Sequence, residues 1–443
     1  MKTIRRPLRL PLLAGLALAV LLPFVGVTGA DAATAKAPVL RPLTARQVAH
    51  RLTGEVYGFL PYWLETKQTA GALRYNLLTT VAFFDIGLAP NGSVDRTWPG
   101  YLALTSPAAN QIITAAHAAG DRVDLTLASF GFLQNRAFLR NRTAQARAIK
   151  QIVQIMAVRG LDGIAVDFES VYRRDLPDFS RFVDALGRAV RAHNRIGRVT
   201  VAVGASQAGA AMAAAAFAGH ADRVLIMGYD YRSANSTTIG STDPLVRRGG
   251  GMSLTWTLNL FAAARLPMNR IVLALPYYGL SWPTSTARPG VAPARSAYGR
   301  SPVYAIRVSK VAMPAGARRG YDPVEASAWV AVYDPHLRVW RQTYYDSPQA
   351  LAAKVALARS RGLSGVGLWA LGYDNGATAD WQVLAKAFQP PPKPQVKPKP
   401  KTHAKPRVHV KPKPKPKHKP KPKPKPRTAP KPTTSASGKP RLD

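Results

Sequence analysis

Eight short apolar runs, separated by stretches with helical spacing, constrain the fold of this 443-residue chain more than any other feature. The runs are residues 56–63, 77–88, 122–132, 161–169, 198–206, 222–231, 270–282 and 365–374. Several are apolar on both faces, as the strands of a parallel sheet are when helices cover it. Eight strand–helix units therefore predict an α/β fold of the (β/α)8 or TIM-barrel type.

The predicted barrel domain covers residues 51–389, more than the roughly 250 residues usual for this fold. Most of the surplus, residues 284–345, lies between the seventh and eighth strands and is rich in Pro, Gly and Tyr. Because it also contains short strand-like pieces, we expect a small α+β insertion on one rim of the barrel. Residues 33–50 are expected to form a linker.

Residues 1–32 resemble a secretory signal peptide. Basic residues precede an apolar run over 10–29, and small residues around 30–32 form a cleavage-like site. An uncleaved anchor is the alternative, because the run is nearly long enough to span a bilayer. Prolines in the run and the cleavage-like site favour cleavage, and hence a secreted protein with no stable transmembrane span. Arg5-Arg6 leaves both the general and the twin-arginine export routes open.

The positive charge of the chain is concentrated at its C-terminal end. The net charge is +39, and from residue 391 onward 15 lysines and 3 arginines against one acid give +17. Residues 33–390 still carry +19. Alternating Lys and Pro in the tail, residues 390–443, exclude helix and central strand, so we expect an extended, disordered tether.

A secreted protein this basic is expected to bind anionic wall polymers through its tail and to remain associated with the cell wall. A purely solvating spacer is the alternative role for the tail. It contains no aromatic residues for base stacking, so no specific nucleic-acid site is predicted. We expect a monomer.

The run 161–169, LDGIAVDFE, carries acids in an otherwise apolar strand. Because side chains alternate along a strand, Ala165, Asp167 and Glu169 share one face and the apolar residues share the other. In a barrel the apolar face packs against the helices, so both acids point into the mouth at the carboxyl end of the fourth strand. Such a close pair raises one pKa, as protonation of a glycosidic oxygen requires. Two structural acids paired with arginines are the alternative.

This run also resembles the D-x-x-D-x-D-x-E signature of glycoside hydrolase family 18, the chitinase family. Asp162, Asp167 and Glu169 match its first, third and last acids, whereas Ala165 replaces the second. Bacterial wall- and spore-associated members of the family read D-G-x-N-x-D-x-E, which this run resembles more closely. Asp162 is expected to be structural, positioning the turn into the strand.

Further matches spread the resemblance over residues 54–388. Met227 with 228–230 resembles the M-x-Y-D motif of the sixth strand, and 275–279 and 367–374 resemble the seventh and eighth strands. Residues 128–131, ASFG, match the family's S-x-G-G only in part.

The resemblance implies a retaining, substrate-assisted mechanism, without metal or other cofactor. Glu169 would protonate the leaving oxygen, and the 2-acetamido carbonyl of the substrate would attack its own anomeric carbon. Asp167 would accept a hydrogen bond from the acetamido N–H, and Tyr229 would hold the acetamido oxygen with Asp230 nearby. Trp369 would stack under the sugar. The eight histidines show no metal-ligand spacing, so no metal site is predicted.

Six further aromatic residues are candidates for a sugar-stacking cleft, although ordinary packing is an equally good explanation for any one of them. They are Tyr57, Tyr62, Trp63, Phe84, Tyr278 and Trp282. Ala165 removes one reason for Asp167 to be protonated or turned away at rest. We therefore expect a slower enzyme or a shifted pH optimum.

The sequence thus predicts a secreted glycoside hydrolase that cleaves β-1,4 linkages at N-acetylglucosamine in peptidoglycan or chitin-type glycans. A non-catalytic, lectin-like wall protein on the same barrel is the alternative.

Overall fold

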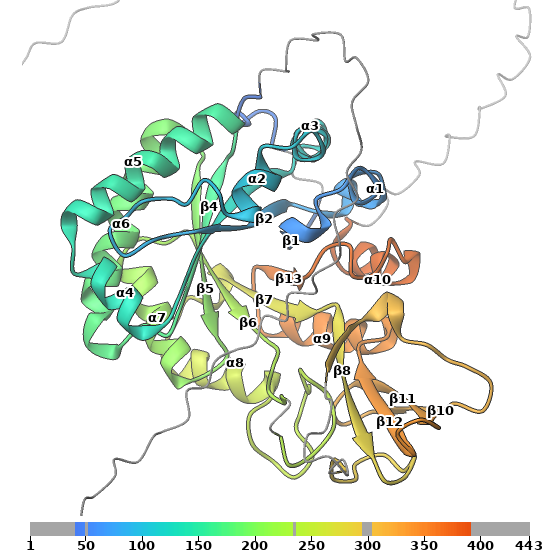
Figure 1. The fold of residues 1–443 in the computed structure, drawn as a ribbon. Coiled ribbons are helices and arrows are strands. Elements are labelled where there is room, and N and C mark those ends of the chain that lie inside the picture. Colours follow the sequence, from blue (N-terminus) through green and yellow to red (C-terminus); the bar gives the residue numbers. More distant parts are fainter. Residues whose placement is uncertain (1–39, 49–51, 234–235, 295–303, 391–443) are drawn as a thin grey trace, which may run out of the picture. The chain divides into compact units, whose positions relative to one another are not determined.

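A computed structural model describes residues 40–48, 52–233, 236–294 and 304–390 of the chain. Within them eight parallel strands close into a barrel of order β1-β13-β7-β6-β5-β4-β3-β2 (Figure 1), which confirms the predicted TIM barrel. The strands are β1 Glu55–Pro61, β2 Thr80–Gly87, β3 Arg122–Phe130, β4 Gly163–Glu169, β5 Arg198–Gly204, β6 Arg223–Met227, β7 Ile271–Pro276 and β13 Gly365–Trp369. The predicted signal peptide and all of the predicted tail beyond residue 390 lie outside the described residues.

Helices follow the strands and cover the outside of the barrel (Figure 1). They are α1 Lys67–Ala72, α2 Pro99–Leu104, α3 Pro107–Ala119, α4 Phe132–Leu139, α5 Arg142–Arg159, α6 Leu176–His193, α7 Gln207–Ala218, α8 Leu254–Ala263, α9 Pro348–Ser360 and α10 Thr378–Phe388. Side-chain N-caps fix where several of them begin. Asn141, Ser206 and Ser253 each accept a hydrogen bond from a backbone N–H in the first turn.

The barrel has two separate apolar layers. Outward-facing strand residues such as Ile164, Val166 and Phe168 pack against the helices in the larger core. Inward-facing residues, among them Tyr57, Phe59 and Ala165, fill the barrel interior. The barrel is therefore filled by side chains below its mouth, which leaves the carboxyl ends of the strands as the place for a site.

An antiparallel sheet of order β10-β11-β12-β8-β9 lies between β7 and β13 in the sequence. Its strands are β8 Tyr278–Thr284, β9 Tyr304–Arg307, β10 Arg318–Asp322, β11 Ser327–Asp334 and β12 Val339–Tyr345. It begins directly after β7, six residues before the predicted insertion at 284. The helical part of its described residues is the single 3-10 turn Val308–Lys310.

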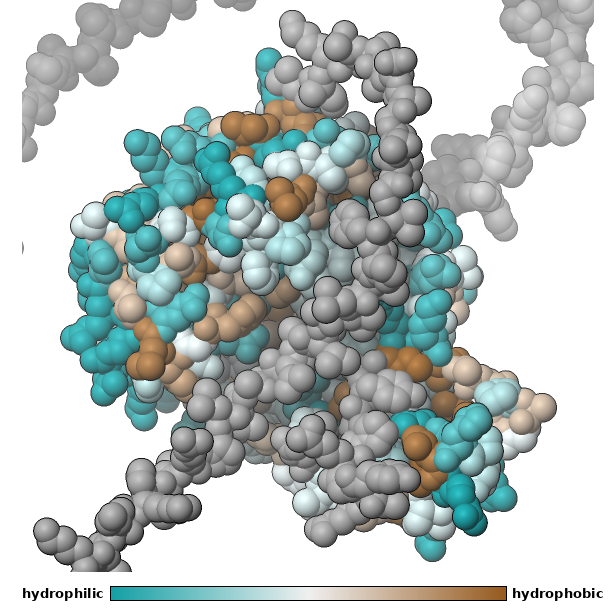
Figure 2. All heavy atoms as spheres, in the orientation of Figure 1, coloured by the Kyte–Doolittle hydropathy of each residue, from teal (hydrophilic) through white to brown (hydrophobic). Residues whose placement is uncertain are grey.

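The outer surface is mostly polar. Figure 2 shows largely hydrophilic side chains over helices α4 to α6, with separate hydrophobic ones between them. No helix in the described ranges is long and apolar enough to cross a membrane. Two non-proline peptide bonds, Phe84–Asp85 and Trp369–Ala370, are cis.

Candidate active site

Strand β4 carries the two acids to the barrel mouth. Ala165 belongs to the interior apolar cluster, so the alternation of side chains turns Asp167 and Glu169 to the same inward side. Asp167 is buried one layer above Ala165, whereas Glu169 ends the strand and is exposed to solvent. The structure therefore brings the predicted acid pair together at the carboxyl end of the barrel.

The surroundings of Asp167 favour its neutral form. Burial, then the negative charges of Glu169 and Asp85, raise its pKa well above the ordinary value. Its Oδ1 atom is buried and has no hydrogen-bond partner among the described residues. Burial, Glu169 and Asp85 therefore favour protonation of Asp167 although Ala165 contributes no charge.

Glu169 has its own carboxylate neighbour. Desolvation in the mouth and the charge of Asp230 raise the pKa of Glu169 above its ordinary value. The side chain of Asn135 on α4 donates a hydrogen bond to the backbone carbonyl of Glu169 and so fixes the end of the strand. An exposed acid with a raised pKa can hold a proton and deliver it to a bound molecule.

Tyr229 and Asp230 follow β6 and complete the far side of the mouth. The ring of Tyr229 packs on the interior cluster, edge-on to Tyr278 with ring centroids 6.1 Å apart. The Tyr278 hydroxyl donates to Oδ1 of Asp230 at 2.5 Å, and the Thr242 hydroxyl donates to the same oxygen at 3.3 Å. Burial raises the pKa of Asp230, and these two donors lower it in part.

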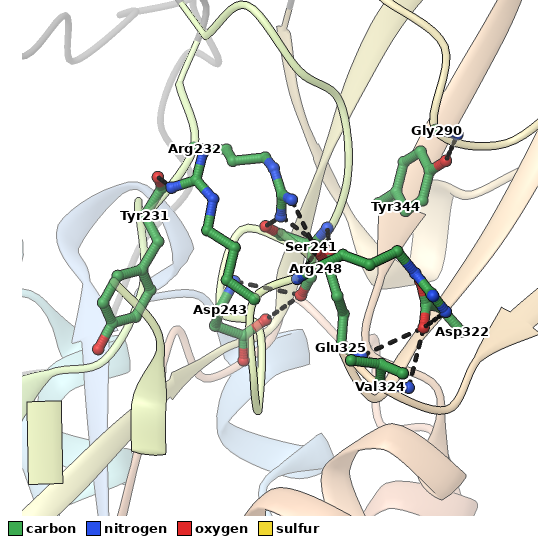
Figure 3. A network of polar contacts seen from close by, with 11 residues as sticks. Tyr231, Arg232, Ser241, Asp243, Arg248, Gly290, Asp322, Val324, Glu325 and Tyr344 are labelled. Atoms are coloured by element: carbon green, nitrogen blue, oxygen red, sulfur yellow. Dashed lines mark hydrogen bonds and ion pairs between the residues drawn. The ribbon is translucent and has the colours of Figure 1, made fainter. Parts of the chain in front are cut away.

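A buried ionic network holds the loop that carries Thr242 (Figure 3). Arg232 forms a bidentate pair with Glu325, in the turn between β10 and β11, at 2.6 and 2.8 Å. Glu325 also accepts a hydrogen bond from the backbone N–H of Ser241 at 3.0 Å. Because Ser241 precedes Thr242, the insertion fixes the loop that in turn fixes Asp230.

Lys354 of α9 holds the same loop through Asp243, the residue that follows Thr242. It is completely buried between two carboxylates, with its Nζ atom 2.6 Å from Oδ1 of Asp243 and also bonded to Asp346. The insertion, α9 and the loop after β6 are thus tied together by charges that are shielded from water.

Trp369, predicted to stack under the sugar, lies at the carboxyl end of a barrel strand. Trp369 ends β13 and is half-buried, and its ring meets Phe84 edge-on with centroids 4.6 Å apart. Phe59 lies beneath both rings, at 5.7 Å from Trp369 and 6.4 Å from Phe84. A half-buried indole on a rigid aromatic base is suited to stacking against a sugar ring.

Three of the predicted stacking residues have other surroundings. Trp282 is 0% exposed in the core of the antiparallel sheet, against Leu280 and Tyr344, so the prediction that it stacks on sugar is wrong. Tyr57 is 2% exposed inside the barrel and donates its hydroxyl to Asp124 at 3.0 Å, which is equally incompatible with stacking. Tyr278 is buried and contacts Asp230 instead of offering a free face.

Asp162 lies at the opposite end of β4 from the mouth and makes structural contacts only. Its two oxygens accept hydrogen bonds from the backbone N–H groups of Leu43 at 2.6 Å and Val123 at 2.8 Å. A ring nitrogen of His117 lies 2.8 Å from Oδ2. Asp162 thus ties the segment before the barrel and the start of β3 to β4, in keeping with the structural role predicted for it.

Sequence reasoning missed Asp85 and Trp98. Asp85 is buried at the carboxyl end of β2, where burial raises its pKa to about 6, and the indole N–H of Trp98 donates to its Oδ1 at 3.2 Å. An acid in the apolar run 77–88 was a signal of the same kind as the acids of β4. The register of β2 shifts between Phe83 and Ile86, so the period-2 alternation of side chains does not give the direction of Asp85.

An aromatic pair that follows β3 and β4, with Phe132 exposed and Tyr172 half-buried, was also missed. Phe132, at the start of α4, stacks on Tyr172 with ring centroids 4.5 Å apart. The guanidinium of Arg174 lies 4.7 Å over the Tyr172 ring. These residues follow the ends of β3 and β4, so they flank the mouth with a flat apolar surface that has a cationic edge.

The residues of the mouth offer proton transfer and hydrogen bonding. In the described parts of the chain, no three His, Asp or Glu side chains gather as a metal site would require. Acid catalysis next to a stacked sugar is the chemistry that this arrangement can perform.

Comparison with known proteins gives a consistent result. The family described as Glycosyl hydrolases family 18 matches residues 63–374. Nod factor hydrolase protein 1 of Medicago truncatula is 28% identical over 177 residues, which are 38% of this chain and 43% of that protein. The Bacillus subtilis (strain 168) protein named as sporulation-specific glycosylase YdhD is 22% identical over 298 residues, 66% of either chain.

Among solved structures, a family GH18 chitinase from Cycas revoluta in complex with allosamidin superimposes with a TM-score of 0.61 at 21% identity. The match covers 76% of this chain and 99% of the chitinase. The matched part therefore spans a whole chitinase domain, but less than two thirds of the length of the two curated relatives.

Proposed function

Because this chain belongs to family 18 of the glycosyl hydrolases and is a glycosidase of the chitinase type, we propose that it cleaves β-1,4 linkages at N-acetylglucosamine by a retaining, substrate-assisted mechanism. The observation that carries this proposal is the placement of Asp167 and Glu169. Both lie at the barrel mouth with raised pKa values, facing Tyr229 and Asp230. A neutral acid beside a leaving group is what bond cleavage needs first.

In the first step Glu169 gives its proton to the glycosidic oxygen, and the bond between that oxygen and the anomeric carbon breaks. The carbonyl oxygen of the 2-acetamido group bonds to the anomeric carbon and forms an oxazolinium ion. Asp167 accepts the acetamido N–H and stabilises the positive charge, while Tyr229 binds the acetamido oxygen. Trp369 supports the sugar from below.

In the second step water attacks the anomeric carbon and loses a proton to the carboxylate of Glu169. The bond from the anomeric carbon to the acetamido oxygen breaks, which restores the acetamido group and the protonated acid. Two displacements at one carbon leave its configuration unchanged, so the first product is the β-anomer.

For the substrate we favour the glycan of the bacterial wall over chitin. The positive charge of residues 33–390 favours retention on an anionic wall, and chitin is uncharged. The B. subtilis relative named as a sporulation-specific glycosylase supports the same choice, and the names of the plant relatives support chitin-type oligosaccharides.

We further propose that the protein is secreted and held at the wall. The N-terminal signal-like segment supports export, and the Lys-Pro tail supports retention by wall polymers. A variant ending at Gln389 should keep its rate on soluble oligosaccharides and wash off sacculi at a lower salt concentration. Loss of activity on soluble substrates would contradict a purely anchoring tail.

The proposed function is tested by incubating the wild type and Glu169→Gln with N-acetylglucosamine oligosaccharides and with purified sacculi, reading products by mass spectrometry. The amide cannot deliver a proton, so we expect the rate to fall by about 10²–10⁴-fold. The first anomer formed, measured by proton NMR, should be β. Equal rates for the two proteins, or an α-anomer, would overturn the assignment.

A further inference from the structure

The mouth contains a buried carboxyl group, Asp85, for which the mechanism above has no use. It comes from β2, two strands away from β4 in the barrel order. It is 5% exposed, and its carboxylate is held by the indole N–H of Trp98. A buried acid is costly unless it has a role or a partner, so its position requires an explanation.

An irregularity in β2 sets the height of Asp85 in the barrel. Phe83 pairs with Leu125 of β3, and Ile86 pairs with Leu127. The two residues between them on β2, Phe84 and Asp85, therefore stand opposite one residue of β3, Thr126. Such a bulge redirects side chains, and bulges of this kind occur next to active sites.

The register partners of this part of β2 can be followed across β3 to β4. Thr126 is the register partner of Ala165 on β4. Asp85 thus lies at the level of Ala165, where the family signature has an acid and this chain has a methyl group. Neighbouring strands are about 4.8 Å apart, so two strands separate the backbones by about 10 Å, a gap that inward-pointing side chains reduce.

The positions of the neighbouring residues on β2 indicate that the side chain of Asp85 does not join the core between the strands and the helices. Phe83 and Ile86 occupy that core, whereas Phe84 packs on the interior cluster with Trp369. Trp98, which donates to Asp85, is 39% exposed, and Tyr62 after β1 lies 6.4 Å from the Trp98 ring. Asp85 is therefore enclosed at the mouth by residues that follow β1 and β2.

We propose that Asp85 is the positioning residue for Asp167, replacing from β2 the carboxylate that β4 lacks at Ala165. The proposal rests on the proposed function, in which Asp167 receives the acetamido N–H. The charge of Asp85 disfavours a second negative charge on Asp167 in the resting enzyme. When the cationic oxazolinium ion forms beside them, the negative charge of Asp85 stabilises it, and Asp167 accepts the acetamido N–H through its carbonyl oxygen, so no proton has to leave Asp167.

The charged and titratable groups that face Asp85 come from three elements. They are Tyr62 after β1 and Asp167 on β4, with Trp98 before α2 as the hydrogen-bond donor. Burial raises the pKa of Asp85 to about 6, although Trp98 lowers it in part. At neutral pH Asp85 is therefore mostly charged, whereas burial and the charges of Glu169 and Asp85 favour the protonated form of Asp167.

The test compares Asp85→Asn with the wild type in the pH profiles of kcat and kcat/KM on N-acetylglucosamine oligosaccharides. Without the neighbouring charge the pKa of Asp167 falls. The part of the pH profile that reflects the ionisation of Asp167 should therefore move by about one pH unit toward acid, and kcat at pH 7 should be about tenfold lower. Asp184→Asn, on the outer helix α6, removes one charge elsewhere and should change neither. KM should change less than kcat, because Asp85 does not contact the substrate.

Two further variants keep the test decisive if Asp85→Asn is unstable. Trp98→Phe removes only the donor, so the pKa of Asp85 rises, and the variant should fall between the wild type and Asp85→Asn at pH 7 and approach the wild type at pH 8.5. Ala165→Asp restores the acid on β4, so the double variant Ala165→Asp/Asp85→Asn should regain most of the lost kcat. Thermal midpoints establish that each variant is folded.

An unchanged pH profile in both Asp85→Asn and Trp98→Phe would overturn the proposal, and so would a loss in Asp85→Asn that Ala165→Asp leaves unrepaired. Failure of the proposed function has a different signature. In that case Glu169→Gln would keep wild-type activity, whatever the Asp85 variants do.

Discussion

Lys354 offers the sharpest test of how the antiparallel sheet supports the mouth. Its ammonium group is completely buried between Asp243 and Asp346. Burial alone would lower the pKa of Lys354, but the two acids raise it above its ordinary value. Burial, and then Asp346, raise the pKa of Asp243 well above its ordinary value, although Lys354 lowers it in part. The cation therefore keeps charge on a carboxyl pair that burial would otherwise neutralise.

Lys354→Met should destabilise the fold by an amount that depends on pH. Without the cation, one further carboxyl must take up a proton when the chain folds, whereas in the unfolded chain it ionises near pH 3.9. A group with a raised folded pKa loses stability as pH rises, at about 1.4 kcal/mol per unit. The deficit should be about 4 kcal/mol at pH 7, within the usual 3–5 kcal/mol for a broken buried pair, and about 1.5 kcal/mol at pH 5.

Thermal unfolding at the two pH values measures this difference. At about 2 °C per kcal/mol the midpoint should fall by about 8 °C at pH 7 and about 3 °C at pH 5. Lys386→Met, an exposed lysine on α10, is the matched control and should shift the midpoint little. The triple variant Lys354→Met/Asp243→Asn/Asp346→Asn should show a deficit that no longer changes with pH. A deficit of equal size at both pH values in Lys354→Met would refute the reasoning.

Three further changes have distinct expected results. Tyr278→Phe removes a donor that lowers the pKa of Asp230, so the pH at which Asp230 ionises should rise by about one unit in the pH profile of kcat; an unmoved profile would deny the contact a functional role. Asp162→Ala removes the acceptor of three buried contacts, so the unfolding free energy should drop by about 3 kcal/mol while kcat per folded molecule is retained. Arg174→Gln removes an exposed charge from the aromatic surface of Tyr172, so activity on anionic sacculi should fall by up to about fivefold with activity on neutral oligosaccharides unchanged; an equal loss on both substrates would exclude charge recognition.

The barrel could be predicted from the sequence because its signal is repeated and local. Each of the eight apolar runs contains a barrel strand, and the period-2 pattern of β4 alone placed Asp167 and Glu169 on the inner face. Such patterns depend on neighbours in the chain and need no knowledge of distant contacts.

The residues that were misplaced depend on tertiary contacts instead. Trp282 follows β7 closely enough to suggest the mouth, but it belongs to β8 and is buried by Tyr344, 62 residues further along the chain. The direction of Asp85 could not be predicted, because a bulge at Phe84 and Asp85 interrupts the alternation of side chains along β2. A bulge adds one residue to one strand and leaves no mark in composition or period.

The distribution of charge links the fold to the proposed chemistry. The chain has a net charge of +39, yet its mouth gathers four carboxyl groups, those of Asp85, Asp167, Glu169 and Asp230. Burial is the largest cause of the raised pKa of each of them. A reaction that develops positive charge in this place is favoured, because the surrounding carboxyl groups are fixed before it begins. The basic surface and the acidic mouth thus serve different steps, the first retention on an anionic polymer and the second stabilisation of a cationic intermediate.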